Sequence, residues 1–143
     1  MNIINRSIKL TAELFPSAQE TSLKERWRNK VYHFAYVYKK NRLLSIGQNY
    51  PRYPNNKVFS FAKRFGIKDW LSHPFVHAEL DAISKLWGKY HIDSSLKFVV
   101  LRFNRFGQIK NSKPCSNCKK ILNALDVVEV YWSNINGGFS YGI

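Results

Sequence analysis

His77-Ala78-Glu79-Leu80 and Pro114-Cys115-Ser116-Asn117-Cys118 are the two short stretches that decide the fold expected for this chain of 143 residues. Together they supply one imidazole, two thiols and one carboxylate. A catalytic zinc ion takes three protein ligands and leaves a fourth position open, whereas a structural zinc ion is closed by four ligands. His77, Cys115 and Cys118 make three ligands, so the sequence predicts one open Zn²⁺ site per chain.

Glu79 is the carboxylate that remains beside these ligands, two residues from His77. Zinc lowers the pKa of a bound water molecule toward about 7, which gives a hydroxide nucleophile at neutral pH. A glutamate in a helix is usually a solvated surface residue, but this one can reach a water molecule on the metal without being a ligand. The sequence therefore predicts metal-assisted hydrolysis with Glu79 as the catalytic acid and base.

Both stretches are expected to begin a helix, over 77–90 and over 115–125. Pro114 suits the first turn of the second helix, because its missing N–H is no loss there. Cys115 and Cys118 then lie at positions i and i+3 on one helical face. The partial positive charge at a helix N-terminus favours the thiolate form that zinc requires. Two helix N-termini are thus expected to meet at the metal.

Two other kinds of site fit part of the pattern. The two cysteines alone have the C-x-x-C spacing of a redox pair, but that interpretation leaves His77 and Glu79 without a role. A closed Cys2His2 zinc site would recruit His73, whose spacing from His77 is H-x3-H. Pro74 breaks a helix between those two histidines, which counts against the closed site.

Hydrophobic periodicity predicts helices and strands in alternation, which indicates an α/β layer fold with a mixed sheet. The chain is long enough for one domain, and we expect a single domain over 1–143. Beyond the two helices above, the expected elements are a helix over 4–15 closed by Pro16, helical turns over 22–28, a strand over 31–39, a turn at Asn41-Arg42, a strand over 43–47, a loop with a short helix over 50–76, a strand over 97–103, a turn at Phe106-Gly107 and a strand over 127–132.

The pattern H-x-E followed by P-C-x-x-C resembles the signature of the cytidine deaminase-like superfamily of zinc-dependent nucleobase deaminases, of cytidine and deoxycytidylate deaminase type. The resemblance covers most of the chain, from about Trp27 to Ser133. It implies a three-layer α/β/α fold with a mixed five-stranded sheet and two zinc-bearing helices side by side. It also implies attack of the zinc hydroxide on C4 of cytosine or C6 of adenine, with Glu79 carrying the proton and ammonia leaving.

The same resemblance implies substrate contacts. Leu44-Ser45-Ile46-Gly47-Gln48-Asn49 looks like the family's strand that ends in G-x-N, so Asn49 would bind a sugar hydroxyl. The backbone N–H of Ala78 would meet the base carbonyl, the backbone carbonyl of Lys113 would receive the exocyclic amine, and Ser112 would line the same edge. An asparagine that only adopts a turn conformation explains Asn49 nearly as well.

The charge of the chain is informative about its substrate. The sequence contains 23 Lys and Arg and nine Asp and Glu, for a net charge of +14. Such an excess is typical of proteins that bind polyanions. It also serves solubility, and a free nucleotide attracts Lys and Arg through its phosphate. The expected partner is therefore single-stranded nucleic acid or a pyrimidine nucleotide such as deoxycytidylate. An adenine deaminase of tRNA type and a non-catalytic zinc-stabilised nucleic-acid-binding module remain alternatives.

The sequence contains no apolar run long enough to cross a bilayer and no signal-peptide core with a cleavage site. Two cysteines committed to a metal favour a reducing compartment, so we expect a cytoplasmic protein without a membrane partner. The pattern leaves the oligomeric state open.

Overall fold

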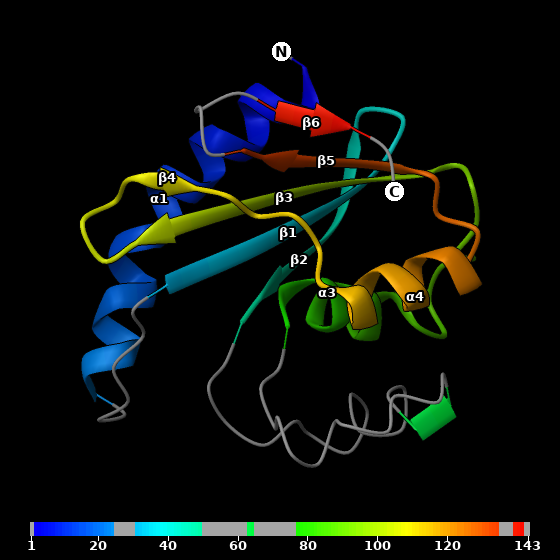
Figure 1. Ribbon diagram of the computed structural model, residues 1–143, viewed down its shortest axis with the longest axis horizontal. Helices are drawn as coiled ribbons and strands as arrows, with labels where there is room; N and C mark the ends of the chain where they lie inside the picture. Colours follow the sequence, from blue (N-terminus) through cyan, green and yellow to red (C-terminus); the bar gives the residue numbers. More distant parts are fainter. Residues whose placement is uncertain (1, 25–30, 50–62, 65–76, 135–138, 142–143) are drawn as a thin grey trace.

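The computed structural model describes residues 2–24, 31–49, 63–64, 77–134 and 139–141, which form a sheet with helices on both faces (Figure 1). The loop and short helix expected over 50–76 lie outside the described residues, except that Lys63 and Arg64 are helical. His73 and the part of the expected helical segment from 25 to 28 also lie outside them.

The sheet is mixed, as expected. Its strands are β1 (Val31–Lys39), β2 (Arg42–Gln48), β3 (Leu96–Asn104), β4 (Ile109–Lys110), β5 (Glu129–Ser133) and β6 (Phe139–Tyr141). Five of them form the continuous path β2-β1-β3-β5-β6, and the two-residue β4 pairs with β3. β3 and β5 are parallel, and the other pairs are antiparallel. The five-stranded path agrees with the expected sheet, although the sequence pattern did not predict β6.

Side-chain alternation divides the core into two layers of packing. On one face, four aromatic residues that alternate along β1 contact β3 side chains and α1 (Ile3–Lys24): Tyr32, Phe34, Tyr36 and Tyr38. On the other face, small and aliphatic residues such as Ala35, Val37 and Val100 pack against α3 (Ala78–Leu86) and α4 (Ser116–Ala124). This arrangement confirms the predicted three-layer α/β/α fold.

α1 continues through Pro16 to Lys24, so the prediction that Pro16 closes this helix was wrong. A proline inside a helix removes one backbone hydrogen bond and tends to bend the helix. Pro16 is exposed, so water can satisfy the carbonyl that loses its partner. Next to it, Phe15 packs edge-on against Tyr32, with ring centroids 5.1 Å apart, and this contact holds the helix on the sheet.

Two buried hydroxyl pairs also fix α1 to β1. The Ser7 and Tyr38 hydroxyls lie 2.9 Å apart, and the Thr11 and Tyr36 hydroxyls lie 2.6 Å apart. Burial raises the pKa of Tyr36 above its ordinary value, so this hydroxyl keeps its proton. Each buried hydroxyl therefore has a partner, as folded proteins require.

Several other expected boundaries need correction. The first ligand-bearing helix ends at Leu86 rather than at residue 90, because Trp87 leaves the helical conformation and Gly88 has φ +82. The turn of the first hairpin is Lys40-Asn41 rather than Asn41-Arg42, since Arg42 already belongs to β2. β5 begins at residue 129 rather than at 127.

Among the described residues, the structure contains no helix long and apolar enough to cross a membrane.

Candidate metal centre

The N-termini of α3 and α4 each present an expected ligand as the N-cap residue. His77 precedes α3 in an extended conformation, with φ −80 and ψ 147, and Cys115 precedes α4 with φ −67 and ψ 168. The Cys115 sulfur accepts a hydrogen bond from the Cys118 backbone N–H at 3.4 Å. The expectation that α4 begins at Cys115, with Pro114 in its first turn, was therefore wrong. A side chain that accepts from the first turn belongs at the N-cap, one residue before the helix.

His77, Cys115 and Cys118 come together from these elements, with their ligand atoms all within 4.8 Å of one another. His77 Nδ1 lies 3.5 Å from Cys115 Sγ. Zinc bonds of about 2.3 Å to sulfur and about 2.0 to 2.1 Å to nitrogen, at a tetrahedral angle, would place these two atoms about 3.6 Å apart. The donor types and this distance between His77 and Cys115 thus fit a zinc ion. Within the described part of the chain, no further His, Cys, Asp or Glu joins this group.

The two thiols of the cluster differ in their electrostatics. A hydrogen bond from the Cys118 thiol lowers the pKa of Cys115, burial opposes that shift, and a hydrogen bond with His77 lowers the pKa further. The same bond with Cys115, together with burial, raises the pKa of Cys118. The hydrogen bond between the two thiols therefore favours the thiolate on Cys115 over the thiolate on Cys118. A zinc ion takes up both sulfurs as thiolates, so its binding would release the Cys118 proton.

Glu79 lies under the cluster, with 3% of its surface exposed. Burial raises the pKa of Glu79, and a hydrogen bond with the Cys118 side chain and the nearby His77 oppose that shift. In contrast, Cys115 is exposed and His77 is half-buried, so solvent reaches the cluster from their side. A buried carboxylate with a raised pKa beside an accessible His and Cys cluster has the properties of a group that transfers protons.

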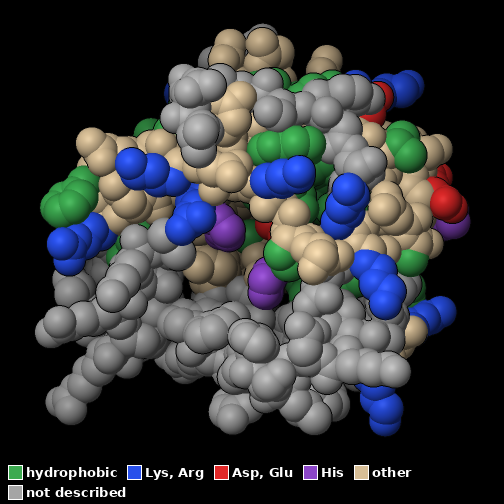
Figure 2. All heavy atoms as spheres, in the orientation of Figure 1, with side chains coloured by type: hydrophobic (Ala, Val, Ile, Leu, Met, Phe, Trp, Pro, Cys, Tyr) green, Lys and Arg blue, Asp and Glu red, His purple; other side chains and the backbone are tan. Residues whose placement is uncertain are grey.

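Figure 2 shows where the surface is hollowed on the face that carries the cluster. Histidine side chains lie at a hollow in the middle of this face, and Lys and Arg side chains line its upper rim (Figure 2). Red acidic side chains are sparse on this view, which agrees with the net charge of +14. The approach to the cluster on this face is therefore electropositive.

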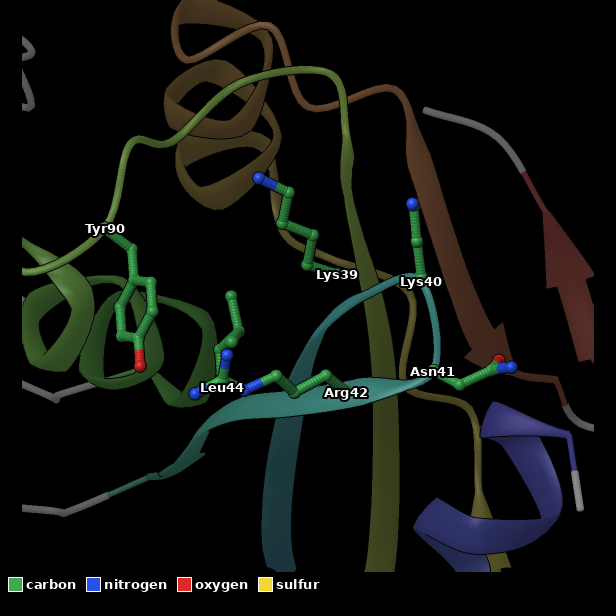
Figure 3. A pocket seen from close by; sticks show the side chains of 6 residues that line it. All are labelled: Lys39, Lys40, Asn41, Arg42, Leu44 and Tyr90. Atoms are coloured by element: carbon green, nitrogen blue, oxygen red, sulfur yellow. The ribbon is translucent and has the colours of Figure 1, made fainter.

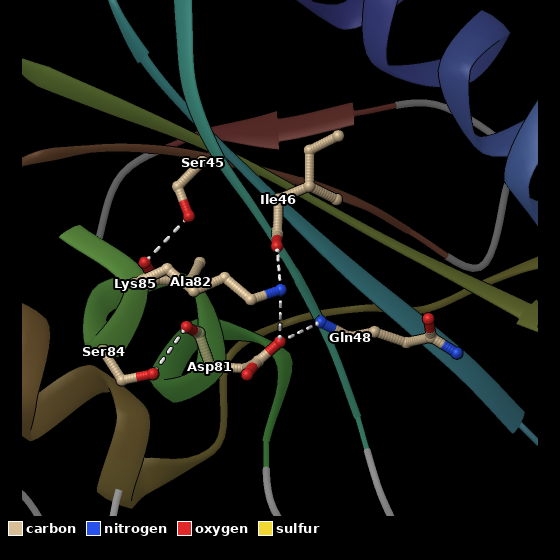
Figure 4. A network of polar contacts seen from close by, with 7 residues as sticks. All are labelled: Ser45, Ile46, Gln48, Asp81, Ala82, Ser84 and Lys85. Atoms are coloured by element: carbon tan, nitrogen blue, oxygen red, sulfur yellow. Dashed lines mark hydrogen bonds and ion pairs between the residues drawn. The ribbon is translucent and has the colours of Figure 1, made fainter. Parts of the chain in front are cut away.

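Asp81 ties the end of β2 to α3, a contact that the sequence pattern did not predict (Figure 4). Its carboxylate is 6% exposed, accepts a hydrogen bond from Gln48 N at 3.0 Å and pairs with Lys85 at 3.1 Å. The Lys85 ammonium also donates to Ile46 O at 2.8 Å. Asp81 is an acidic residue in the first turn of a helix, which was the available signal. The network holds the G-x-N strand against the ligand-bearing helix.

Asn49 continues the pairing of β2 with β1 beyond the last strand residue. Its backbone N–H donates to His33 O at 3.2 Å, and its side-chain oxygen accepts from His33 N at 2.8 Å. The side-chain oxygen is thus occupied in the sheet, in the manner of an asparagine that mimics backbone pairing. Contact between Asn49 and a sugar hydroxyl stays a prediction.

His33 is a site residue that the sequence pattern missed. Its Nε2 atom is buried and has no hydrogen-bond partner within the described residues. Burial, followed by the charges of Arg102 and His77, lowers the pKa of His33 to about 4, so its imidazole is neutral at pH 7. The available signal was a histidine in an otherwise apolar alternating strand, whose cross-strand partner is Arg102.

The other expected substrate residues have different surroundings. Ala78 is the first residue of α3, where a backbone N–H has no acceptor inside the helix. Lys113 is exposed, and its N–H donates to Asn111 Oδ1 at 3.2 Å. The Ser112 hydroxyl is buried, donates to Val100 O at 2.7 Å and accepts from Ser133 N at 2.8 Å. Ser112 thus anchors the segment before Cys115 to the sheet, and its burial does not support a substrate contact by its side chain.

Comparison with known proteins gives one similar structure to report. No family model and no curated protein matches the sequence. Among solved structures, the chain is similar to the crystal structure of dCMP deaminase from the cyanophage S-TIM5 in apo form, with 18% sequence identity and a TM-score of 0.48. The similar region covers 89% of this chain and 84% of that chain.

Proposed function

We propose that this chain is a zinc-dependent hydrolytic deaminase that converts cytosine to uracil in single-stranded DNA or RNA and releases ammonia. One observation carries the proposal: three ligand atoms of open-site type lie within 4.8 Å of one another beside a buried glutamate that is not part of their group. A redox cysteine pair would not need Glu79 or His77, and a closed zinc site would need a fourth ligand.

His77, Cys115 and Cys118 would hold a zinc ion, which supplies an activated water molecule when it is bound. Glu79 would accept a proton from that water, deliver it to the ring nitrogen and later protonate the departing amine. The overall balance is cytosine plus water to uracil plus ammonia, with no redox partner. The raised pKa of Glu79 supports both directions of transfer, because burial makes the protonated form of the carboxyl group easier to reach than it is in water.

Positioning of the base would fall to backbone groups at the two helix N-termini. The Ala78 N–H would hold the ring carbonyl oxygen, and the Lys113 carbonyl would accept from the exocyclic amine. Asn49 would bind a sugar hydroxyl from the end of β2. What supports these roles is their place in the chain: Ala78 and Lys113 flank the metal ligands, and Asn49 is held to His33 on the neighbouring strand.

The substrate is proposed to be polymeric because the described basic side chains extend well beyond the cluster. A free deoxycytidylate carries one phosphate group, which a single basic residue can satisfy. Unpaired bases in a single strand need no extraction from a duplex before they enter a deaminase site. The excess of 14 positive charges suits a strand of phosphates better than one nucleotide.

The test is product analysis by mass spectrometry in ¹⁸O-labelled water. Zinc-loaded protein is incubated with cytosine and adenine as nucleosides, as nucleotides and within single-stranded oligonucleotides. We expect oligonucleotide cytosine to become uracil with one labelled oxygen. Conversion of mononucleotides alone would move the substrate to deoxycytidylate or a related nucleotide, and conversion of adenine would move it to the other base.

Glu79→Gln is the matched control for this test, because it keeps the size of the side chain and removes only the exchangeable charge. It should bind zinc in the same amount as the unchanged protein and lose deamination by about 100-fold or more. Full activity in this variant, or no conversion of any substrate by zinc-loaded protein, would contradict the proposed mechanism.

A further inference from the structure

A basic pocket lies at the β1–β2 hairpin, at the opposite end of these strands from the metal centre. Its volume is about 450 Å³. The residues that line it are Lys39, Lys40, Asn41, Arg42, Leu44 and Tyr90 (Figure 3). We call it the hairpin pocket. Three of its six residues carry positive charge, and none of the six is acidic.

The fold alone gives no reason to gather these charges. Lys39 and Arg42 face each other directly as a cross-strand pair, and like charges in that position destabilise a sheet. Lys40 adopts φ 54, a left-handed conformation that favours glycine or asparagine. No described carboxylate forms an ion pair with any of the three cations. The hairpin therefore keeps three cations together at a cost to its own stability.

Asp93 is the carboxylate whose charge interacts with Lys39, and it has partners of its own. Hydrogen bonds from Ser95 are the main cause that lowers the pKa of Asp93, and Lys39 is the smallest contributor. His91 lies 3.7 Å from the Asp93 carboxylate. Asp93 does not line the hairpin pocket, so the positive charge there is left for a ligand.

The backbone of the turn is braced by α1, which covers the other face of the sheet. Arg6 of α1 donates a hydrogen bond to Asn41 O at 2.9 Å. Its guanidinium also lies 5.7 Å from the centre of the Tyr38 ring. This contact adds a fourth positive charge beside the turn.

The remaining lining is apolar and aromatic. The register between β1 and β2 shifts after Val37, which pairs with Ser45, so that Leu44 has no cross-strand partner. Leu44 is half-buried against the α3 side of the core, and Tyr90 beyond α3 is 41% exposed. In Figure 3, Arg42 extends from the strand toward Tyr90, with Leu44 on the same side. Cations beside an exposed aromatic ring are what a stacked base with its phosphate requires.

We propose that the hairpin pocket binds one nucleotide of a single-stranded nucleic acid, with a phosphate on Lys39, Lys40 and Arg42 and a base stacked on Tyr90. The proposal rests on the proposed function only in taking the substrate to be a single strand. Lys39 lies six residues along β1 from His33, a span of about 20 Å. At about 3.4 Å per stacked nucleotide, that span corresponds to about six nucleotides, and an extended strand needs fewer. A mononucleotide is too small to occupy both sites.

The test is fluorescence anisotropy with a labelled single-stranded thymidine oligonucleotide, which contains no amine to remove. The double variant Lys40→Ala, Arg42→Ala should weaken binding by about tenfold or more at low salt. The slope of log affinity against log salt should fall by about 1.4, since each lost contact to a single strand removes about 0.7. Lys9→Ala is the matched control, because Lys9 is exposed on α1, which covers the other face of the sheet. It should bind like the unchanged protein.

Substitutions of Tyr90 separate the contribution of base stacking to binding from the contribution of charge. Tyr90→Phe should keep the affinity, and Tyr90→Ala should weaken binding without changing the salt slope, because it removes a ring and no cation. These side chains are exposed, and circular dichroism melts check that each variant stays folded. If the double variant and Tyr90→Ala both bind as the unchanged protein does, the hairpin pocket is not a strand site.

Free nucleotides form the second arm of the test. Thymidine mono- and triphosphate should compete poorly with the oligonucleotide, and a triphosphate that binds the pocket more tightly than the strand would overturn the proposal. The probe contains no cytosine, so its binding does not depend on deamination. If the protein shows no deaminase activity but the variants weaken binding, only the proposed function is contradicted. If the protein is active but the variants bind normally, only the proposal for the hairpin pocket is contradicted.

Discussion

A Cβ atom placed on Gly47 would lie 2.1 Å from the carbonyl oxygen of Ala78, far inside contact distance. It would also lie 2.5 Å from the backbone nitrogen of Ala82. The obstacle is helix backbone rather than a flexible side chain, so it cannot swing aside. β2 thus packs directly on the first turn of α3, and the end of this strand sets the position of His77, an expected metal ligand.

Gly47→Ala should therefore destabilise the protein and weaken zinc binding together. Forcing an extra methyl group into a packed region costs typically about 1 to 3 kcal/mol, and here it also displaces the residue that follows His77. Urea unfolding and competition with a zinc-binding dye measure the two effects. Gly88→Ala is the matched control, because nothing lies within 4 Å of its Cβ and only its φ of +82 is unfavourable. Equal losses of zinc affinity in both variants would refute the link.

Cys115 has a second role, as the acceptor that caps α4, and the two roles can be separated. Cys115→Ser keeps an oxygen acceptor at the N-cap, whereas Cys115→Ala removes it. In metal-free protein, the alanine variant should lose about 1 kcal/mol of unfolding free energy and the serine variant much less. Both should lose zinc, as atomic absorption on the dialysed proteins would show. A serine variant that retains stoichiometric zinc would remove Cys115 from the ligand set.

His73 distinguishes an open zinc site from a closed one. His73→Ala should bind one zinc per chain with unchanged affinity, because the three described ligands suffice for a site with an open position. Zinc content and deamination are measured on the same preparation, with His77→Ala as the control that loses both. Loss of zinc from His73→Ala would instead establish the closed Cys2His2 site.

The stability of the metal-free protein should depend on pH through His33. The pKa of His33 is lowered from 6.5 to about 4, chiefly by burial. Between these two pH values the unfolded chain binds a proton at His33 and the folded chain does not. Stability present above pH 6.5 is therefore lost as the pH falls toward 4, at up to about 1.4 kcal/mol per pH unit. Urea unfolding of the unchanged protein and of His33→Gln, in the presence of a chelator, measures the difference. Parallel stability curves for the two proteins would contradict the assignment to His33.

The predictions that held were those that depend on residue type and short spacing. His77, Cys115 and Cys118 could be grouped from the sequence alone, because few combinations of ligands at helix starts serve one metal. The strand over 31–39 followed from the alternation of its side chains, and β1 spans Val31–Lys39.

The predictions that failed, and the features that were missed, depend on contacts between distant segments. Pro16 stays inside a helix because Phe15 packs on a strand that follows later in the chain. Asp81 has its role because β2 ends at Gln48, whose backbone N–H donates to the Asp81 carboxylate. His33 has its role because Asn49 pairs with it across the two strands. A sequence pattern gives the type of such residues but not the register that brings them together.

The two hydroxyl pairs under α1 have a consequence for how the molecule can move. Ser7 and Thr11 are separated by about 6 Å along the helix, and Tyr38 and Tyr36 by nearly the same length along the strand. If the helix slid by one turn, a buried hydroxyl on each element would lose its partner. The free-energy penalty for those unsatisfied hydroxyls disfavours the slide. α1 therefore has one position on its face of the sheet. Among the described elements, we therefore expect a rearrangement that admits a ligand on the side of α3 and α4.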